Sequence, residues 1–181
     1  LSDAIGNTAI GSKSLFTNTI GTQNSAVGYQ SLYFNNTGIN NNAVGAYALH
    51  KNVSGSFNCA SGSYALHNNT GGSNNNAEGA YALFTNTVGS SNTAMGYQSL
   101  FGNTSNNNTA IGYNAIRNNV GGDANTALGY QALYNGTSGL QNCAFGYQSL
   151  YATSANYNTA FGTQTLFNNI TGAANVALGG F

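Results

Sequence analysis

Few residues of this chain could support acid–base or metal chemistry. Among 181 residues, six carry a formal charge and two are histidines. The charged residues are Asp3, Lys13, Lys51, Glu78, Arg117 and Asp123, and the histidines are His50 and His67. No carboxylates are paired as general acid–base catalysis needs, and no serine has a histidine and a carboxylate positioned with it. We therefore expect no catalytic residues, no metal site and no cofactor, and do not expect an enzyme.

An internal repeat sets the positions of these residues. The pentapeptide Asn-x-Ala-x-Gly occurs eleven times, at spacings of 16 or 17 residues. The repeat glycines are Gly11, Gly28, Gly45, Gly62, Gly79, Gly96, Gly112, Gly129, Gly146, Gly162 and Gly179. Such a period indicates a repeat architecture, in which each unit packs on its neighbours. Positions are counted below from the repeat glycine, which is position 0.

The invariant positions of the repeat predict β-structure. Asparagine at −4, alanine at −2, glycine at 0 and leucine or isoleucine at +4 share one parity, and the positions between them vary. In the sixth unit these residues are Asn92, Ala94, Gly96 and Leu100. A period of two is typical of strands. We expect each unit to form a strand, a bend near the glycine, a second strand and a polar turn, with the invariant residues inside a narrow coil.

The expected fold is an all-β parallel β-solenoid of about ten 17-residue coils, with residues 1–181 as a single repeat domain. Because the chain enters and leaves the repeat in the middle of a unit, we expect it to be a segment of a longer fibre or stack. Two units are one residue shorter, ahead of Gly112 and Gly162. A deletion confined to the turn would leave the strands in register.

The asparagine at −4 allows two interpretations. Its side-chain amide can bond to the same amide in the next coil and form a ladder. Alternatively, it holds a left-handed turn conformation, which asparagine tolerates. Cys59 and Cys143 occupy one repeat position five coils apart, too far for a disulfide. We therefore expect two free thiols.

The variable columns at −1 and +5 are mainly apolar and are expected to face outward. A stripe of large apolar side chains is more than a soluble monomer normally exposes, and copies of the same chain are its simplest cover. A formal net charge of zero offers no basic patch for nucleic acid. The apolar runs are too short to insert into a membrane.

One region departs from the repeat around Gly45, Gly62 and Gly79. There the tyrosine moves from +1 to +2, column −1 becomes polar and column +5 becomes histidine. The residues of this predicted patch are Tyr47, His50, Ser61, Tyr64, His67, Glu78 and Tyr81. The patch is either a local repacking of a subunit contact or a ligand site, and in a trimer its histidines with Glu78 nearby could bind a metal. The rings of His50 and His67 should stack at strand spacing.

Tyrosines at +1 predict an aromatic ladder on four successive coils. Its members are Tyr97, Tyr113, Tyr130 and Tyr147. Such a ladder either stabilises the solenoid or binds sugar rings, whose flat apolar faces pack on aromatic side chains.

The segment 108–115, Asn-Thr-Ala-Ile-Gly-Tyr-Asn-Ala, resembles the head repeats of YadA-type trimeric autotransporter adhesins. It is also similar to the Asn-Thr-Ala-x-Gly-Tyr-Gln-Ala-Leu repeats of phage-type tail fibres and related bacterial surface proteins. This resemblance implies a left-handed parallel β-roll in a homotrimer, used as a projecting fibre or an adhesive head. The repeat of 17 residues is longer than that of YadA-type heads.

The expected function is that of an extracellular structural or adhesive fibre segment on a cell or virion surface. Its expected partners are copies of itself, as a homotrimer or a head-to-tail filament, and a host-surface glycan or protein. The alternatives are an ice-binding or a carbohydrate-binding β-solenoid. Ice binding needs a regular array of threonine, whereas column −3 mixes threonine with serine, asparagine, cysteine and valine.

Overall fold

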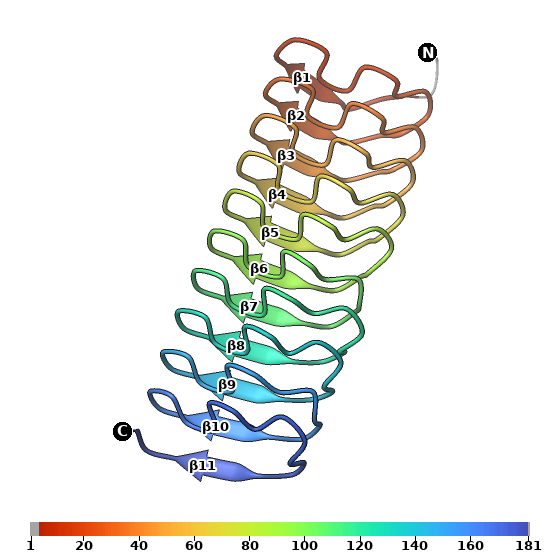
Figure 1. Ribbon diagram of the computed structural model, residues 1–181. Coiled ribbons are helices and arrows are strands. Elements are labelled where there is room, and N and C mark those ends of the chain that lie inside the picture. Colours follow the sequence, from red (N-terminus) through yellow and green to blue (C-terminus); the bar gives the residue numbers. More distant parts are fainter. Residues whose placement is uncertain (1–3, 181) are drawn as a thin grey trace.

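The computed structural model describes residues 4–180, which form a rod of stacked coils (Figure 1). Eleven short strands pair in chain order into one parallel sheet along the rod, which confirms the predicted solenoid. The strands are β1 (Thr8–Ile10), β2 (Ser25–Val27), β3 (Asn42–Val44), β4 (Cys59–Ser61), β5 (Asn76–Glu78), β6 (Thr93–Met95), β7 (Thr109–Ile111), β8 (Thr126–Leu128), β9 (Cys143–Phe145), β10 (Thr159–Phe161) and β11 (Val176–Leu178). Within residues 4–180 no helix is long and apolar enough to cross a membrane.

The register of the sheet is uniform, including at the two shorter units. Ala94 pairs with Ala110 and Ala144 with Ala160 across the 16-residue spacings. The missing residue lies in the polar turn. From Gly28 onward, the other units carry a glycine seven residues before the repeat glycine, whereas the two shorter units carry Ser105 and Ala155 at that position. The prediction that these deletions spare the strands is confirmed.

The predicted second strand after the repeat glycine is wrong. Each coil has one strand of three residues, and the chain then turns, with left-handed backbone at +2 and +4. In the sixth unit φ is 53° at Gln98 and 50° at Leu100. A left-handed residue costs roughly 1–2 kcal/mol, but full burial of a leucine side chain contributes about as much or more. Leu100 is fully buried, and its N–H donates to the carbonyl of Ala115 at 3.0 Å.

Small residues fill the interior of each coil. The alanine at −2, the leucine or isoleucine at +4 and an alanine or serine at +3 are buried in most coils, as Ala94, Leu100 and Ser99 show. The repeat glycine lies in the wall, because Gly96 is partly exposed and has a φ of 129°. The interior is too narrow for aromatic side chains, and these are left to the outer faces.

The asparagines at −4 form the predicted ladder. In a representative step, the Asn75 side-chain Nδ2 and backbone N–H both donate to Oδ1 of Asn58, at 3.1 and 3.0 Å. Nδ2 of Asn75 also donates to the carbonyl of Gly89 at 2.8 Å. The alternative of a left-handed turn is wrong for this column, since the positive φ falls one residue earlier, at 59° in Asn74.

A second asparagine ladder at +7 was not predicted. Nδ2 of Asn52 donates to Oδ1 of Asn35 and to the carbonyl of Gly55, both at 2.8 Å. The ladder runs unbroken from Asn18 to Asn86. Asparagine at this position in most units was the available sequence signal. Two buried amide ladders thus connect successive coils from within.

Candidate functional site

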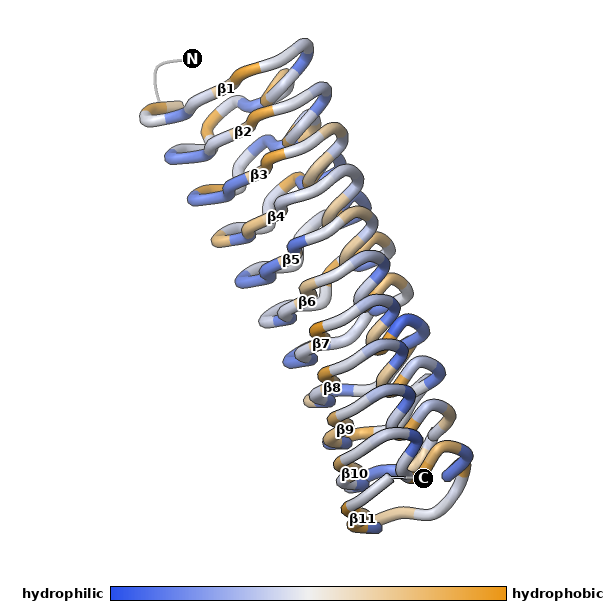
Figure 2. Tube along the Cα trace, turned by 90° about the vertical axis from the view of Figure 1, so that its left-hand side faces the viewer, coloured by the Kyte–Doolittle hydropathy of each residue, from blue (hydrophilic) through white to orange (hydrophobic). Residues whose placement is uncertain are grey.

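The outer face of the sheet carries an exposed apolar stripe at positions −1 and +1, named here the sheet stripe. Ile111, Tyr113 and Leu128 are 36%, 46% and 43% exposed. Figure 2 shows hydrophobic segments on β1–β3 and again on β7–β11. The large side chains of the stripe are Ile10, Val27, Tyr29, Val44, Met95, Tyr97, Ile111, Tyr113, Leu128, Tyr130, Phe145, Tyr147, Phe161 and Leu178. The predicted outward placement of column −1 is confirmed.

Polar residues interrupt the sheet stripe at β4 and β5. Ser61 and Glu78 are paired in the register of these two strands, and both are exposed. The longer apolar part of the stripe therefore begins at Met95.

The tyrosine ladder at +1 is a continuous stack. Ring centroids from Tyr97 to Tyr113, from Tyr113 to Tyr130 and from Tyr130 to Tyr147 are 5.3, 5.4 and 5.3 Å apart, with planes within 19° of parallel. At this spacing each inner ring has both faces covered by its neighbours, and only ring edges and hydroxyl groups remain for contact. The geometry thus supports the stabilising interpretation of this ladder over stacking of sugar rings on it.

A second stack, named here the aromatic column, follows position +5 along the rod. Its members are Phe16, Tyr33, His50, His67, Phe84, Phe101, Arg117, Tyr134, Tyr151 and Phe167. The rings of His50 and His67 lie 5.1 Å apart and 13° from parallel, as expected. The Arg117 guanidinium lies 5.0 Å from the ring of Phe101 and 5.9 Å from that of Tyr134. Mutual cover leaves most of this column half-buried.

The structure brings together five of the seven residues of the predicted patch. Tyr47, Tyr64 and Tyr81 stack at 4.9 and 5.1 Å, and Tyr47 and Tyr64 contact His50 and His67 at 5.4 Å each. Ser61 and Glu78 lie apart from them, on the outer face of the sheet. Within residues 4–180 no three His, Cys, Asp or Glu side chains are grouped to hold a metal ion.

Both cysteines are free thiols, as expected. They lie on β4 and β9 at column −3, where five of the other strands carry threonine. Burial raises the pKa of the Cys143 thiol, which disfavours the reactive thiolate.

The half-buried ring of His67 predicts a loss of stability in mild acid. Burial lowers the pKa of His67 below its usual value of about 6.5, the hydrogen bond with Asn68 opposes this, and His50 and Lys51 add to the lowering. The unfolded chain therefore takes up a proton before folded His67 does. The free energy of unfolding should then fall as the pH drops below about 6.5.

This pH dependence can be measured as the melting temperature between pH 7.5 and pH 5. His67→Phe keeps a ring in the aromatic column, like Phe84 in the next coil, and should reduce the decrease seen in the parent protein. At pH 7.5 the two proteins should melt at similar temperatures. An equal decrease in the variant would show that His67 is not responsible.

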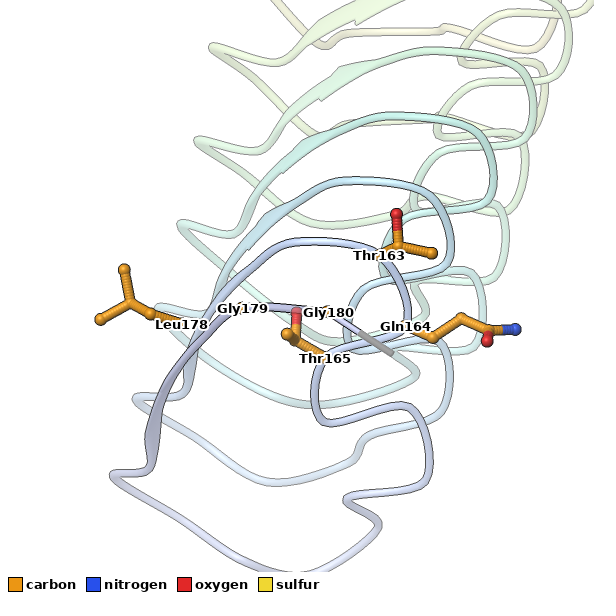
Figure 3. Close-up of a pocket in the computed structure, with 6 residues that line it drawn as sticks. All are labelled: Thr163, Gln164, Thr165, Leu178, Gly179 and Gly180. Carbon is orange, nitrogen blue, oxygen red and sulfur yellow. The ribbon is translucent and has the colours of Figure 1, made fainter.

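Two shallow hollows lie at the ends of the described rod. One is lined by Thr163, Gln164, Thr165, Leu178, Gly179 and Gly180 (Figure 3). The other is lined by Ile5, Gly6, Thr22 and Gln23. Both are open ends of the stack of described coils, and they hold no group of titratable side chains.

A third hollow lies along the side of the rod and is named here the Phe34 groove. It has a volume of about 530 Å³ and is lined by Thr17, Thr19, Phe34, Asn36, Lys51, Val53 and Thr70. These residues come from columns +6 and +8 of four successive coils. Sequence reasoning missed this groove. A phenylalanine and a lysine at +6, where other units carry Thr, Asn, Gly or Ala, were the signal.

These observations define the chain as a parallel β-solenoid of about ten coils with internal asparagine ladders and aromatic outer faces. Comparisons with protein-family models, with curated proteins and with solved structures found no match. Function is therefore argued from the outer faces of the rod.

Proposed function

We propose that this chain is a non-enzymatic extracellular rod that assembles side by side with copies of itself and presents an adhesive surface. The sheet stripe is the observation that carries this proposal. Contiguous exposed apolar patches of more than a few hundred Å² are uncommon on soluble monomers and mark interaction sites. The stripe extends over β6–β10 without a charged residue.

The size of the stripe fits a protein–protein contact. Between Met95 and Phe161 nine large side chains belong to it, and those with stated exposures are 36% to 47% exposed. Covering them would bury on the order of 700 Å² per copy, close to the ~800 Å² per partner of a standard stable interface. A formal net charge of zero adds no long-range repulsion between copies.

A second copy is the partner that suits this stripe best. The side chains of the stripe repeat once per coil, so that a parallel copy presents the same period along its whole length. A homotrimer satisfies this requirement and accords with the adhesin-like repeat. Head-to-tail association is the other assembly that we expect. The rigid interior supports a structural role, because two amide ladders hold each coil to the next.

The assembly can be tested with Ile111→Lys/Leu128→Lys, which places two ammonium groups in the stripe. Burial of unpaired charges in an apolar contact is costly, and the double variant should be monomeric where the parent chain forms oligomers. Native mass spectrometry and analytical ultracentrifugation give the state of each protein.

Val88→Lys/Val120→Lys is the matched control, since both valines are exposed but lie in the turns away from the stripe, at 64% and 66% exposure. This variant should assemble like the parent. A parent chain that stays monomeric at high concentration would contradict lateral assembly.

An ice-binding role has less support. Threonine occupies the outward −3 position on only β1, β6, β7, β8 and β10 of the eleven strands. Large apolar residues at −1 make the face uneven, whereas an ice-binding face needs a flat array.

A further inference from the structure

The Phe34 groove contains an aromatic ring that is not part of the stacked aromatic column. Phe34 is 45% exposed and lies at +6, outside the aromatic column. Its ring is 4.6 Å from that of Tyr33 and 5.2 Å from that of His50, with planes at 70° and 78°. Phe34 therefore stands roughly perpendicular to the stacked rings.

The faces of Tyr33 are already occupied. Phe16 stacks on one side at 5.3 Å and His50 on the other side at 5.3 Å. Tyr33 and His50 can thus offer only their edges to Phe34, and one face of Phe34 covers these edges. The opposite face of Phe34 is open to the groove, unlike the covered faces of the inner ladder tyrosines.

Lys51 supplies a positive charge beside this open face. It occupies column +6 in the next coil, and its side chain is exposed. Within residues 4–180 only Glu78 and Asp123 carry side-chain carboxylates. Glu78 lies on the outer face of β5, and Asp123 accepts a hydrogen bond from the Asn106 N–H. The Lys51 ammonium therefore has no ion-pair partner among the described residues.

We propose that the Phe34 groove binds an acidic sugar, a hexuronic acid residue of an anionic polysaccharide. The apolar C–H face of the sugar ring lies on the open face of Phe34, and the carboxylate pairs with Lys51. The hydroxyl groups of Thr17 and Thr70 donate to backbone carbonyls, and that of Thr19 donates to Asn36 Oδ1. The threonine oxygens can therefore accept from the sugar hydroxyls, and Asn36 Nδ2 can donate to them. This inference rests on the proposed adhesive role, for which it names the ligand class.

The size of the groove and its combination of apolar, hydroxyl, amide and cationic side chains support a sugar over other anions. A volume of about 530 Å³ is within the usual range for small-ligand sites and holds one or two sugar residues. Val53 and Phe34 form an apolar floor, while Thr17, Thr19, Asn36 and Thr70 line it with polar groups. A neutral sugar would leave the Lys51 charge unpaired, and a purely aromatic acid has no hydroxyl groups to bond with Asn36 Nδ2 or with the threonine oxygens.

The test is a titration of the full chain with glucuronic acid, and with a disaccharide that contains glucuronic acid. Calorimetry and NMR measure the binding during each titration. Saturable binding is expected, and it should weaken as salt is added. Phe34→Ala and Lys51→Gln should each weaken it by at least about tenfold. Lys51→Gln changes an exposed side chain, so it tests the site without endangering the fold.

The matched controls are Phe57→Ala and Lys13→Gln, which should bind like the parent. Phe57 is an exposed aromatic residue outside the groove, and its column carries alanine at Ala124. The column of Lys13 carries glutamine at Gln30. Glucose should bind more weakly than glucuronic acid, and benzoate should not match it.

No saturable binding of either uronate, or equal loss in the control variants, would overturn the site. Benzoate binding as tight as that of glucuronate would overturn the sugar assignment. Lateral assembly is measured separately on the sheet stripe, whose residues are not part of the groove. Failure of uronate binding with intact oligomers would therefore reject this inference and leave the proposed assembly standing.

Discussion

Replacement of Gly62 by alanine should lower the free energy of unfolding by more than about 4 kcal/mol, an exceptional loss for one methyl group. A Cβ at this position would lie 2.6 Å from the carbonyl carbon and 2.7 Å from the carbonyl oxygen of Gly79. The backbone of Gly62 also has a φ of 138°, which residues with a side chain rarely adopt. Both clashing atoms belong to the backbone of the next coil, and relief requires the coils to separate. Urea unfolding followed by circular dichroism measures the loss.

Gly71→Ala is the control for the general effect of replacing a glycine by alanine in this chain. The nearest atom to a Cβ there is Oγ of Ser54 at 3.6 Å, and Gly71 has no positive φ. Alanine should therefore be neutral, or should stabilise by roughly 0.4–1 kcal/mol through the unfolded chain. Equal destabilisation by the two substitutions would show that close stacking of the coils is not what requires Gly62.

Asn75→Ala should cost about 3–5 kcal/mol, because one side chain satisfies several buried groups. Oδ1 of Asn75 accepts from the backbone N–H and from Nδ2 of Asn92, at 3.0 and 3.1 Å. Its Nδ2 donates to Gly89 and Asn58. Truncation leaves the Asn92 N–H buried without a partner and removes one of the two side-chain amides that donate to the Gly89 carbonyl, the other being that of Asn86. Thermal and urea unfolding of the variant give the cost.

Asn76→Thr is the control for this ladder, since Asn76 is the next residue and points outward from β5. Threonine occurs at the same position on the next strand, at Thr93. The control should change the free energy of unfolding by less than about 0.5 kcal/mol, as is usual for surface substitutions. If Asn75→Ala cost no more than Asn76→Thr, the ladder would not be a source of stability.

The two substitutions probe the same physical feature, the close and uniform spacing of the coils. The repeat glycines let the backbones of adjacent coils approach, and this approach puts the asparagine amides within hydrogen-bond distance. The same spacing stacks the aromatic rings at about 5 Å, as in the Tyr113 and Tyr130 pair at 5.4 Å. Rigidity of the interior and order of the outer faces thus have a common origin.

The repeat alone was enough to predict the solenoid and its register, and it offered the first asparagine ladder as one of two interpretations of column −4. Residues at one repeat position occupy one environment in every coil, so that a requirement for Ala94 or Asn92 shows as a column in the sequence. The burial of Leu100 was predicted as well, but from the wrong local structure. A left-handed turn and a strand can direct that side chain to the same interior, and side-chain parity does not distinguish them.

The tertiary structure decided which residues come together in each candidate site. Columns −1 and +5 both vary in the same coils, yet the coil of Gly62 carries Ser61 on the sheet and His67 in the aromatic column, because the turn after Gly62 separates them. Covered faces in the tyrosine ladder, and the open face of Phe34, follow from ring orientations that depend on neighbouring coils. Phe34 and Lys51 each occur once in their column. Repetition determines what every coil shares, whereas a groove made from single residues of four coils exists only once those coils are stacked.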